Sequence, residues 1–244
     1  MASFLMIHGA WHGGWCFDRL RPALEAAGHV MIAPDLPGMD GDAKALAGVT
    51  LDGWADFVIE QARTLSGPVV LCGHSRGGIV ISQAAERAPD AFATLVYISA
   101  VLAQDRCSLY ETIASRPANP TFDAGLTPVD GGLAVAVAPE PAIATFYGRC
   151  DPADQIMAAS RLMAEPVRPL NTPVRISEER YGRVPRHYIE CRHDQTFPLD
   201  LQRAMQAALP CASVTTLESD HSPFLCVPDQ LAAALVSIAE RIET

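Results

Sequence analysis

The stretch Cys72–Gly78, with the sequence Cys-Gly-His-Ser-Arg-Gly-Gly, is the feature that most constrains the fold of this chain. It follows the apolar run Val69–Leu71 and precedes the helix-like run Ile79–Arg87. Glycines on both sides of the serine allow a sharp turn and close packing. In a G-x-S-x-G turn between a strand and a helix, the serine hydroxyl is lifted to where a base can reach it. The pattern predicts Ser75 as a candidate nucleophile, the alternative being an ordinary β–α turn.

The composition is that of a globular protein with one large core. The chain has 244 residues, of which 49% are hydrophobic and 19% are charged, with a net charge of −10. One α/β domain of this length is common. The negative charge argues against a nucleic-acid partner, which requires a basic face. The chain lacks an apolar run of about 18 residues, so we expect no membrane span.

The seven cysteines are scattered, odd in number and without a C-x-x-C pair. This usage favours reduced thiols in a cytoplasmic protein. Cys72 and Cys191 lie in strand-like runs, where we expect small buried hydrophobic side chains. The N-terminus lacks a basic segment and is predicted to be a buried strand, not a signal peptide.

Short apolar runs alternate with helical patterns over most of the chain. The runs are continuous and bounded by Gly, Pro or polar residues, as in parallel strands covered on both faces. The predicted strands are Phe4–Ile7, Val30–Ala33, Val69–Cys72, Leu95–Ile98, Tyr188–Cys191 and Val214–Leu217. The alternation predicts an α/β fold with a mostly parallel, six-stranded, doubly wound sheet.

Residues 104–186 break this alternation. They contain ten of the nineteen prolines of the chain, and regular helix is incompatible with stretches such as Ser115–Pro120. A structureless loop of this length is implausible in a compact domain. We therefore expect a core of residues 1–103 and 187–244, and an inserted lid of residues 104–186 with a helix over about 152–164.

A serine hydroxyl needs a base, and in this fold the expected chain order is Ser, then acid, then His. His221 follows the last predicted strand, at the sheet edge where Ser75 also lies. His193 follows a strand as well and is the competing candidate. It precedes Asp194, however, and an acid is needed at that place. The order therefore favours His221 as the base.

The acid orients the imidazole and stabilises its charged form. Asp194 follows Tyr188–Cys191 on a loop at the required sheet edge. Asp220 adjoins His221, and adjacent side chains rarely form good hydrogen bonds. Asp105, after the Leu95–Ile98 strand, is an alternative acid. Asp194 is the preferred candidate, although alone it could be a solvated loop residue or a helix cap.

The tetrahedral intermediate of acyl transfer needs donors for its oxyanion. The backbone N–H of the residue after the nucleophile, Arg76, is one candidate. The second is expected from the loop His8–Trp15 after the first strand. Its small residues let the backbone approach a substrate, so we predict the N–H of Ala10.

These segments together resemble the α/β-hydrolases, and within them the plant methylesterase and hydroxynitrile lyase branch with its bacterial esterase relatives. The resemblance rests on His8–Trp15, Gly73–Gly78 and Asp220–His221, and further matches at Leu24–His29 and Ser177–Gly182 extend it over nearly the whole chain. It implies a six-stranded core with a lid, a triad of Ser75, Asp194 and His221, catalysis without a cofactor or metal, and often a homodimer.

Two positions separate the activities of this branch. The lyases that this chain resembles carry threonine where Gly9 stands and lysine where Ser222 stands, whereas the esterases have the glycine. The resemblance therefore favours hydrolysis of a small-molecule ester over hydroxynitrile lysis. A non-catalytic small-molecule receptor with a retained triad is a further alternative, and no residue of the chain distinguishes it from an enzyme.

Four aromatic residues are predicted to line the substrate pocket: Trp11, Phe122, Phe146 and Tyr147. Packing in the core would also account for each of them. Such walls suit a small hydrophobic or aromatic acid esterified to methyl or a short alcohol, with larger esters such as pyrethroids as an alternative. Arg76 departs from the uncharged residue that this branch usually has after the nucleophile. We expect its side chain to pair with a lid or core carboxylate, and the alternative is a contact to a polar or anionic acyl group.

Overall fold

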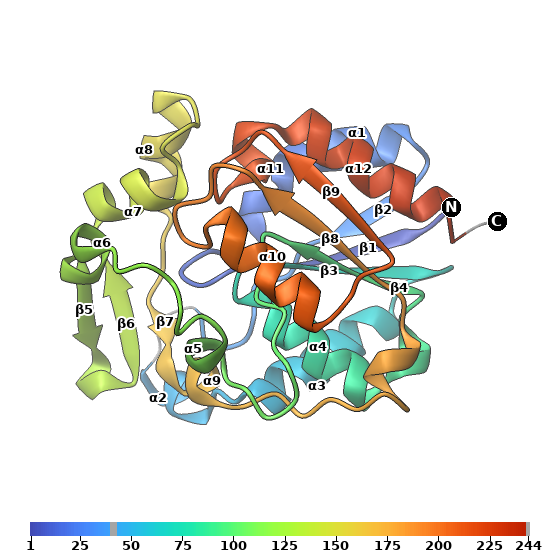
Figure 1. Cartoon of the computed structure of the whole chain (residues 1–244), viewed down its shortest axis with the longest axis horizontal. Coiled ribbons are helices and arrows are strands. Elements are labelled where there is room, and N and C mark those ends of the chain that lie inside the picture. Colours follow the sequence, from blue (N-terminus) through green and yellow to red (C-terminus); the bar gives the residue numbers. More distant parts are fainter. Residues whose placement is uncertain (40–42, 243–244) are drawn as a thin grey trace.

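Six parallel strands form the central sheet of the protein (Figure 1). The computed structural model describes residues 1–39 and 43–242. The strand order is β2-β1-β3-β4-β8-β9, and each neighbouring pair is parallel. The strands are β1 (Ser3–Ile7), β2 (Val30–Ile32), β3 (Val69–His74), β4 (Thr94–Ile98), β8 (Arg186–Cys191) and β9 (Ser213–Leu217). The predicted parallel α/β sheet is confirmed, and its strands β1, β3 and β4 are buried along their whole length.

The two faces of the sheet are covered by different helices. On one face lie η1 (Gly14–Leu20), α1 (Arg21–Ala26), α11 (Pro223–Cys226) and α12 (Pro228–Glu240). On the other lie α2 (Ala43–Gly48), α3 (Leu51–Arg63), α4 (Gly77–Arg87), η2 (Pro89–Ala91) and α10 (Leu199–Ala208). Each face therefore has its own apolar cluster, and the sheet residues alternate between the two clusters.

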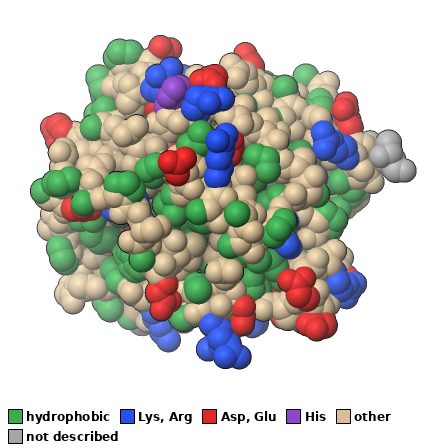
Figure 2. Space-filling model, viewed as in Figure 1, with side chains coloured by type: hydrophobic (Ala, Val, Ile, Leu, Met, Phe, Trp, Pro, Cys, Tyr) green, Lys and Arg blue, Asp and Glu red, His purple; other side chains and the backbone are tan. Residues whose placement is uncertain are grey.

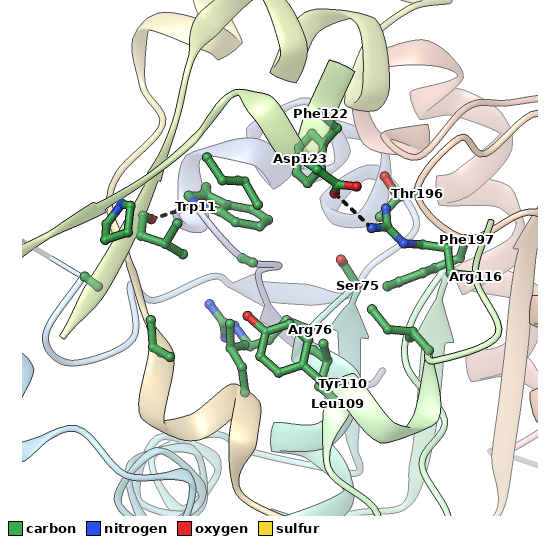
Figure 3. A pocket seen from close by; sticks show the side chains of 18 of the residues that line it. Trp11, Ser75, Arg76, Leu109, Tyr110, Arg116, Phe122, Asp123, Thr196 and Phe197 are labelled. Atoms are coloured by element: carbon green, nitrogen blue, oxygen red, sulfur yellow. Dashed lines mark hydrogen bonds and ion pairs between the residues drawn. The ribbon is translucent and has the colours of Figure 1, made fainter. Parts of the chain in front are cut away.

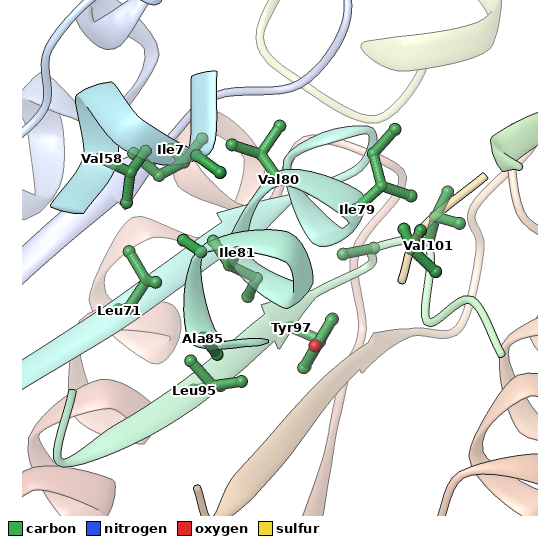
Figure 4. Packing of buried hydrophobic residues seen from close by; sticks show 14 of the residues in the cluster. Ile7, Val58, Leu71, Ile79, Val80, Ile81, Ala85, Leu95, Tyr97 and Val101 are labelled. Carbon is green, nitrogen blue, oxygen red and sulfur yellow. The ribbon is translucent and has the colours of Figure 1, made fainter. Parts of the chain in front are cut away.

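Helix α4 fixes the position of the Ser75 turn because its apolar face packs on the strands that precede and follow it. Figure 4 shows Ile81 and Ala85 of α4 over Leu71 of β3 and Leu95 of β4. All four side chains are fully buried. Burial of such side chains contributes roughly 1.5–3 kcal/mol each for the larger ones. The turn between β3 and α4 is thus held by core packing on both sides.

The segment between β4 and β8 forms small elements of its own at one end of the sheet (Figure 1). Its strands β5 (Leu126–Val129), β6 (Ala134–Val137) and β7 (Glu165–Pro166) make an antiparallel sheet. Its helices are α5 (Leu109–Thr112), α6 (Pro120–Ala124), η3 (Asp130–Gly132), α7 (Pro139–Phe146), α8 (Pro152–Ser160), α9 (Val167–Asn171) and η4 (Tyr181–Arg183). We call residues 104–186 the inserted segment; their division from the core as a lid stays a prediction.

Helix α8 ends at Ser160, four residues before the predicted end at about residue 164. The chain leaves the helix because the N–H of Met163 donates to the carbonyl of Trp11, at 2.8 Å. Glu165 then pairs with β6 in the small sheet. The inserted segment is in this way joined to the loop after β1.

The surface and the thiols agree with the composition. Figure 2 shows acidic and basic side chains interspersed on the visible face, with no continuous basic stripe among its described residues. Among the described helices, none has the length and apolar character needed to cross a bilayer. All seven cysteines are free, and the predicted burial of Cys72 and Cys191 is confirmed.

Candidate active site

Ser75 occupies a left-handed turn at the end of β3, with φ of 53°. A non-glycine residue with positive φ is strained and persists only where its surroundings hold it. Close backbone contacts do so here: a Cβ on Gly77 would lie 2.6 Å from the carbonyl oxygen of Ile7, and one on Gly78 would lie 2.1 Å from that of Val101. The glycines of the motif are therefore required by close packing of the turn.

The structure brings together the three residues predicted as a triad. The Nε2 atom of His221 lies 2.9 Å from Ser75 Oγ, and its Nδ1 atom lies 2.7 Å from Oδ2 of Asp194. A carboxylate accepts only, so Nδ1 carries the proton and Nε2 is free to accept from the serine hydroxyl. All three residues are buried. This arrangement can remove a proton from Ser75 as the hydroxyl attacks a carbonyl.

Asp194 is held by both of its carboxylate oxygens. Oδ1 accepts from the N–H groups of Thr196 and Phe197, at 2.6 and 2.8 Å. Oδ2 accepts from Nδ1 of His221 and also from the hydroxyl of Ser99. Ser99 directly follows β4, has φ of 38° and is fully buried. Ser99 is not among the residues predicted from the sequence, although its position just after a central strand could have indicated it.

The competing candidates lie elsewhere. His193 is partly exposed and pairs with Glu218, 3.0 Å away. Asp220 accepts from the N–H groups of Arg149 and Ser222. Asp105 accepts from the N–H of Ile176, on the outside of the inserted segment. None of the three is hydrogen-bonded to His221 in the described part of the chain.

His74 orients the backbone of His221. Its Nε2 atom lies 2.8 Å from the carbonyl oxygen of His221, which can only accept, so Nε2 carries the proton. Burial is the main cause that lowers the pKa of His74 well below 6.5, and the nearby rings of His221 and His12 lower it further. His74 therefore adds no positive charge beside the ring of His221.

Two backbone amides near Ser75 have no acceptor among the described residues. They are the N–H groups of Ala10 and Arg76, the two predicted oxyanion donors. Both residues line the same cavity as Ser75. An unpaired donor at a cavity wall is suited to a developing negative charge on a bound molecule.

The cavity beside Ser75 has a volume of about 490 Å³. Figure 3 shows the Ser75 hydroxyl pointing into it, between Trp11, Phe122, Tyr110 and Phe197. The further lining is mostly apolar and comes largely from the inserted segment: Leu109, Ile113, Leu126, Pro128, Ala134, Val135, Val167 and Leu170. The charged side chains among its lining residues are those of Arg76, Arg116 and Asp123, and the last two form an ion pair at 3.4 Å.

Of the four predicted aromatic pocket residues, Trp11 and Phe122 line this cavity, and Phe146 and Tyr147 lie outside its lining. Phe146 packs on the rings of Trp11 and His221, with centroids 5.8 and 5.6 Å away. The hydroxyl of Tyr147 reaches His12. The end of α7 therefore packs against the rings of Trp11, His12 and His221.

The Arg76 side chain pairs with a carboxylate, as predicted. Its Nε atom lies 2.9 Å from Oε1 of Glu165, and both side chains are buried. The guanidinium lies over the ring of Trp54, with Cζ 4.4 Å from the ring centroid. The sequence could not identify Glu165 as the partner, because 89 residues separate it from Arg76.

A candidate metal-ligand group is formed by Cys150, Asp220 and Cys226, whose ligand atoms all lie within 4.8 Å of one another. The Cys150 thiol lies 4.0 Å from Oδ2 of Asp220. Asp220 accepts from backbone amides, and the thiol of Cys226 lies 3.5 Å from the carbonyl of Arg149. Internal hydrogen bonds therefore account for this group.

His12 supplies a pH dependence of stability. It is fully buried, with Nδ1 2.7 Å from the Ala10 carbonyl and Nε2 2.7 Å from the Tyr147 hydroxyl. Its pKa is lowered from 6.5 to about 4, chiefly by burial. Between these two pH values the unfolded chain binds a proton that the folded chain does not bind. The free energy of unfolding should therefore fall as the pH is lowered from 6.5 to 4, by about 3 kcal/mol from this residue.

Denaturant unfolding at several pH values measures this effect in the wild type and in His12→Gln. The variant should lose less stability over this interval than the wild type. His8 and His74 remain in both proteins, so the difference between the two losses reports mainly on His12. Equal losses in the two proteins would show that His12 is not held neutral.

Three comparisons with known proteins agree with this geometry. Residues 4–234 match the sequence profile of a family described as "Alpha/beta hydrolase family". The pyrethroid hydrolase of Sphingobium wenxiniae is 31% identical over 98% of this chain and 88% of its own length. Salicylic acid-binding protein 2 of Nicotiana tabacum is 29% identical over 98% of this chain and 97% of its own. The crystal structure of polyneuridine aldehyde esterase superposes with a TM-score of 0.86 at 25% identity, covering 98% of this chain and 99% of that one.

Proposed function

The chain belongs to the α/β-hydrolase family, and from this we propose that it is a serine carboxylic ester hydrolase with Ser75, His221 and Asp194 as its triad. The observation that carries the proposal is the placement of Ser75 Oγ, 2.9 Å from His221 Nε2 and at the wall of an apolar cavity. The names of the relatives, which include a pyrethroid hydrolase and several methylesterases, support an esterase.

The reaction begins when Ser75 attacks the ester carbonyl and His221 takes its proton. Asp194 stabilises the imidazolium, and the N–H groups of Ala10 and Arg76 bind the oxyanion. His221 then protonates the leaving alcohol. Water releases the acyl group by the same route, with His221 again taking and returning a proton.

The substrate is a neutral ester with a hydrophobic or aromatic acyl group, joined to methyl or a short alcohol. A cavity of about 490 Å³ with apolar walls suits such a molecule. Its charged side chains support a neutral substrate, because Arg116 pairs with Asp123 and Arg76 pairs with Glu165. A cytoplasmic location and a homodimer stay predictions.

Position 9 supports hydrolysis over hydroxynitrile lysis. A Cβ on Gly9 would lie 2.8 Å from both Ser75 Cβ and His74 Nδ1. The threonine found here in the lyases would therefore displace the loop that carries Ala10. At the other diagnostic position, Ser222 is buried and offers no cation for cyanide.

A panel of esters tests this proposal. We expect the kcat/KM for methyl esters of apolar aromatic acids to be at least about 100-fold higher than for the same esters with an added free carboxylate. The added carboxylate would be an unpaired charge in an apolar cavity, which costs several kcal/mol. Initial rates on matched neutral and acidic esters, p-nitrophenyl esters and a pyrethroid measure this preference.

The controls separate the alternatives. Release of cyanide from mandelonitrile would favour a lyase. Tight binding of an aromatic acid without turnover of any ester would favour a receptor. A preference for acidic esters would contradict the proposed substrate class but not the esterase.

A further inference from the structure

The buried Arg76–Glu165 pair contacts the loop that carries the second oxyanion donor. Arg76 Nη2 donates to the carbonyl oxygen of Gly9 at 3.0 Å. Glu165 Oε2 accepts from the N–H of Trp11 at 3.1 Å. The two charged side chains thus bind the backbone on either side of Ala10, and the pair lies at 0–1% exposure.

The Gly9 carbonyl and the Ala10 N–H belong to one peptide unit. In a planar trans peptide these two groups point in opposite directions. A donor that holds the Gly9 carbonyl therefore also sets the direction of the Ala10 N–H. The carbonyl accepts from His8 Nδ1 at 2.9 Å as well, and from the N–H of His12 at 3.4 Å.

The loop needs such support because its next residue is strained. Trp11 has φ of 62°, a left-handed conformation that is unfavourable for a bulky side chain. Glu165 accepts from its N–H, and His12 Nδ1 holds the Ala10 carbonyl of the same peptide unit, at 2.7 Å. The Trp11 side chain is fixed separately, through Nε1 to the carbonyl of Val135 at 2.9 Å.

The guanidinium itself is held in one orientation. It is fixed by the ion pair to Glu165 and by the ring of Trp54 beneath it. In Figure 3 it extends from the Ser75 turn toward the side of the cavity where Trp11 lies. A lysine could supply the charge, but it lacks the planar fork that reaches Glu165 and Gly9 together.

We propose that Arg76 and Glu165 are positioning residues that aim the Ala10 N–H at the oxyanion of the tetrahedral intermediate. This inference rests on the proposed ester hydrolysis. It assigns the Arg76 side chain a role in the transition state and none in contacting the acyl group. It also makes β7 of the inserted segment, through Glu165, a support for the oxyanion hole.

Kinetics of Arg76→Met, Arg76→Lys, Glu165→Gln and the double variant R76M/E165Q test the proposal. Removing one partner leaves a buried charge unpaired, so the single variants can unfold. The double variant removes both charges and keeps an acceptor for the Trp11 N–H, and it is the fold-competent test. We expect its kcat to fall about 10- to 100-fold, with KM nearly unchanged. This loss is smaller than the one caused by deleting an oxyanion donor, because the Ala10 N–H is still present.

Two readouts separate positioning from structural support and from substrate contact. Affinity for an alkyl boronic acid, which forms a tetrahedral adduct with the serine, should fall by the same factor as kcat/KM. The ratio of kcat/KM for acidic and neutral esters should not change. Lysine should restore part of the kcat that methionine loses.

Asp154→Asn is the matched control. Arg19 and Asp154 also form an ion pair between the core and the inserted segment, and among the described residues neither side chain is hydrogen-bonded to the loop after β1. This variant should lose stability without loss of kcat. A folded double variant with wild-type kcat and boronate affinity would overturn the proposal, and so would a crystal structure of it in which the Gly9–Ala10 peptide keeps its orientation.

Failure of the proposed function is distinguishable from failure of this inference. If wild-type protein hydrolyses no ester of the panel, the esterase itself is refuted. If wild type is active and Ser75→Ala is not, the esterase stands. The kinetics of the Arg76 and Glu165 variants then decide the positioning role alone.

Discussion

Replacing Ser75 with alanine should lower kcat for ester hydrolysis about 10⁴- to 10⁶-fold, the range of losses measured for triad nucleophiles. The change removes the one hydroxyl that lies 2.9 Å from His221 Nε2. The cavity and both free amides remain, so KM should change much less than kcat. Steady-state kinetics on the best ester of the panel measure the fall in kcat. A fluorophosphonate, which labels a nucleophilic serine, should no longer label the variant.

Ser222→Ala is the control for this substitution. Ser222 follows His221 directly and is equally buried, but its hydroxyl has no partner among the described residues. Truncating it breaks no hydrogen bond, so kcat should stay within about threefold of wild type. Turnover by Ser75→Ala at the wild-type rate would refute Ser75 as the nucleophile, provided contaminating esterase is excluded by a second purification.

The sheet was predictable because its strands are marked by local patterns. The runs ending at Ile7, Leu71 and Ile98 are continuous and apolar, and such runs are typical of strands buried on both faces. Ser75, Asp194 and His221 each follow a strand. Because the strands are parallel, the loops after them lie at the same edge of the sheet. What local patterns cannot supply is the exact partner of each side chain.

The inserted segment was less predictable, because its short elements depend on contacts with the core. Helix α8 ends early since Met163 is bound by the Trp11 carbonyl, a contact between residues 152 positions apart. Phe146 and Tyr147 were expected in the pocket on their aromatic character alone. Which face of α7 meets the cavity is decided by the packing of that helix on His12 and His221.

Long-range pairs also decided the roles of Ser99 and Glu165. Both residues support groups that the sequence did identify, Asp194 and the Ala10 loop. Neither residue belongs to a sequence motif. Ser99 contacts Asp194, 95 residues away, and Glu165 contacts Arg76, 89 residues away. The position of Ser99 after a strand could have indicated a residue near the site, but the partner of each supporting residue is known only from the folded chain.

Asp194→Asn should lower kcat by about 10⁴-fold, because it changes the tautomer of His221. Oδ1 of Asp194 accepts from the N–H groups of Thr196 and Phe197. An asparagine will keep its carbonyl oxygen at that place, so its NH₂ group will face Nδ1 of His221. Nδ1 must then accept, and the ring proton moves to Nε2. In that tautomer His221 cannot take a proton from Ser75.

Asp220→Asn is the matched control, because Asp220 is also buried and lies beside His221 in the sequence. Its carboxylate holds the amides of Arg149 and Ser222, and an asparagine oxygen can still accept from one of them. We expect kcat to fall less than about 10-fold, the cost of one weakened hydrogen bond. Comparing kcat of the Asp194→Asn and Asp220→Asn variants at constant pH decides between the two acids. Thermal unfolding verifies that both variants are folded. A large loss in Asp220→Asn with near wild-type turnover in Asp194→Asn would move the acid of the triad to Asp220, and would require the imidazole of His221 to turn away from Asp194 during the reaction.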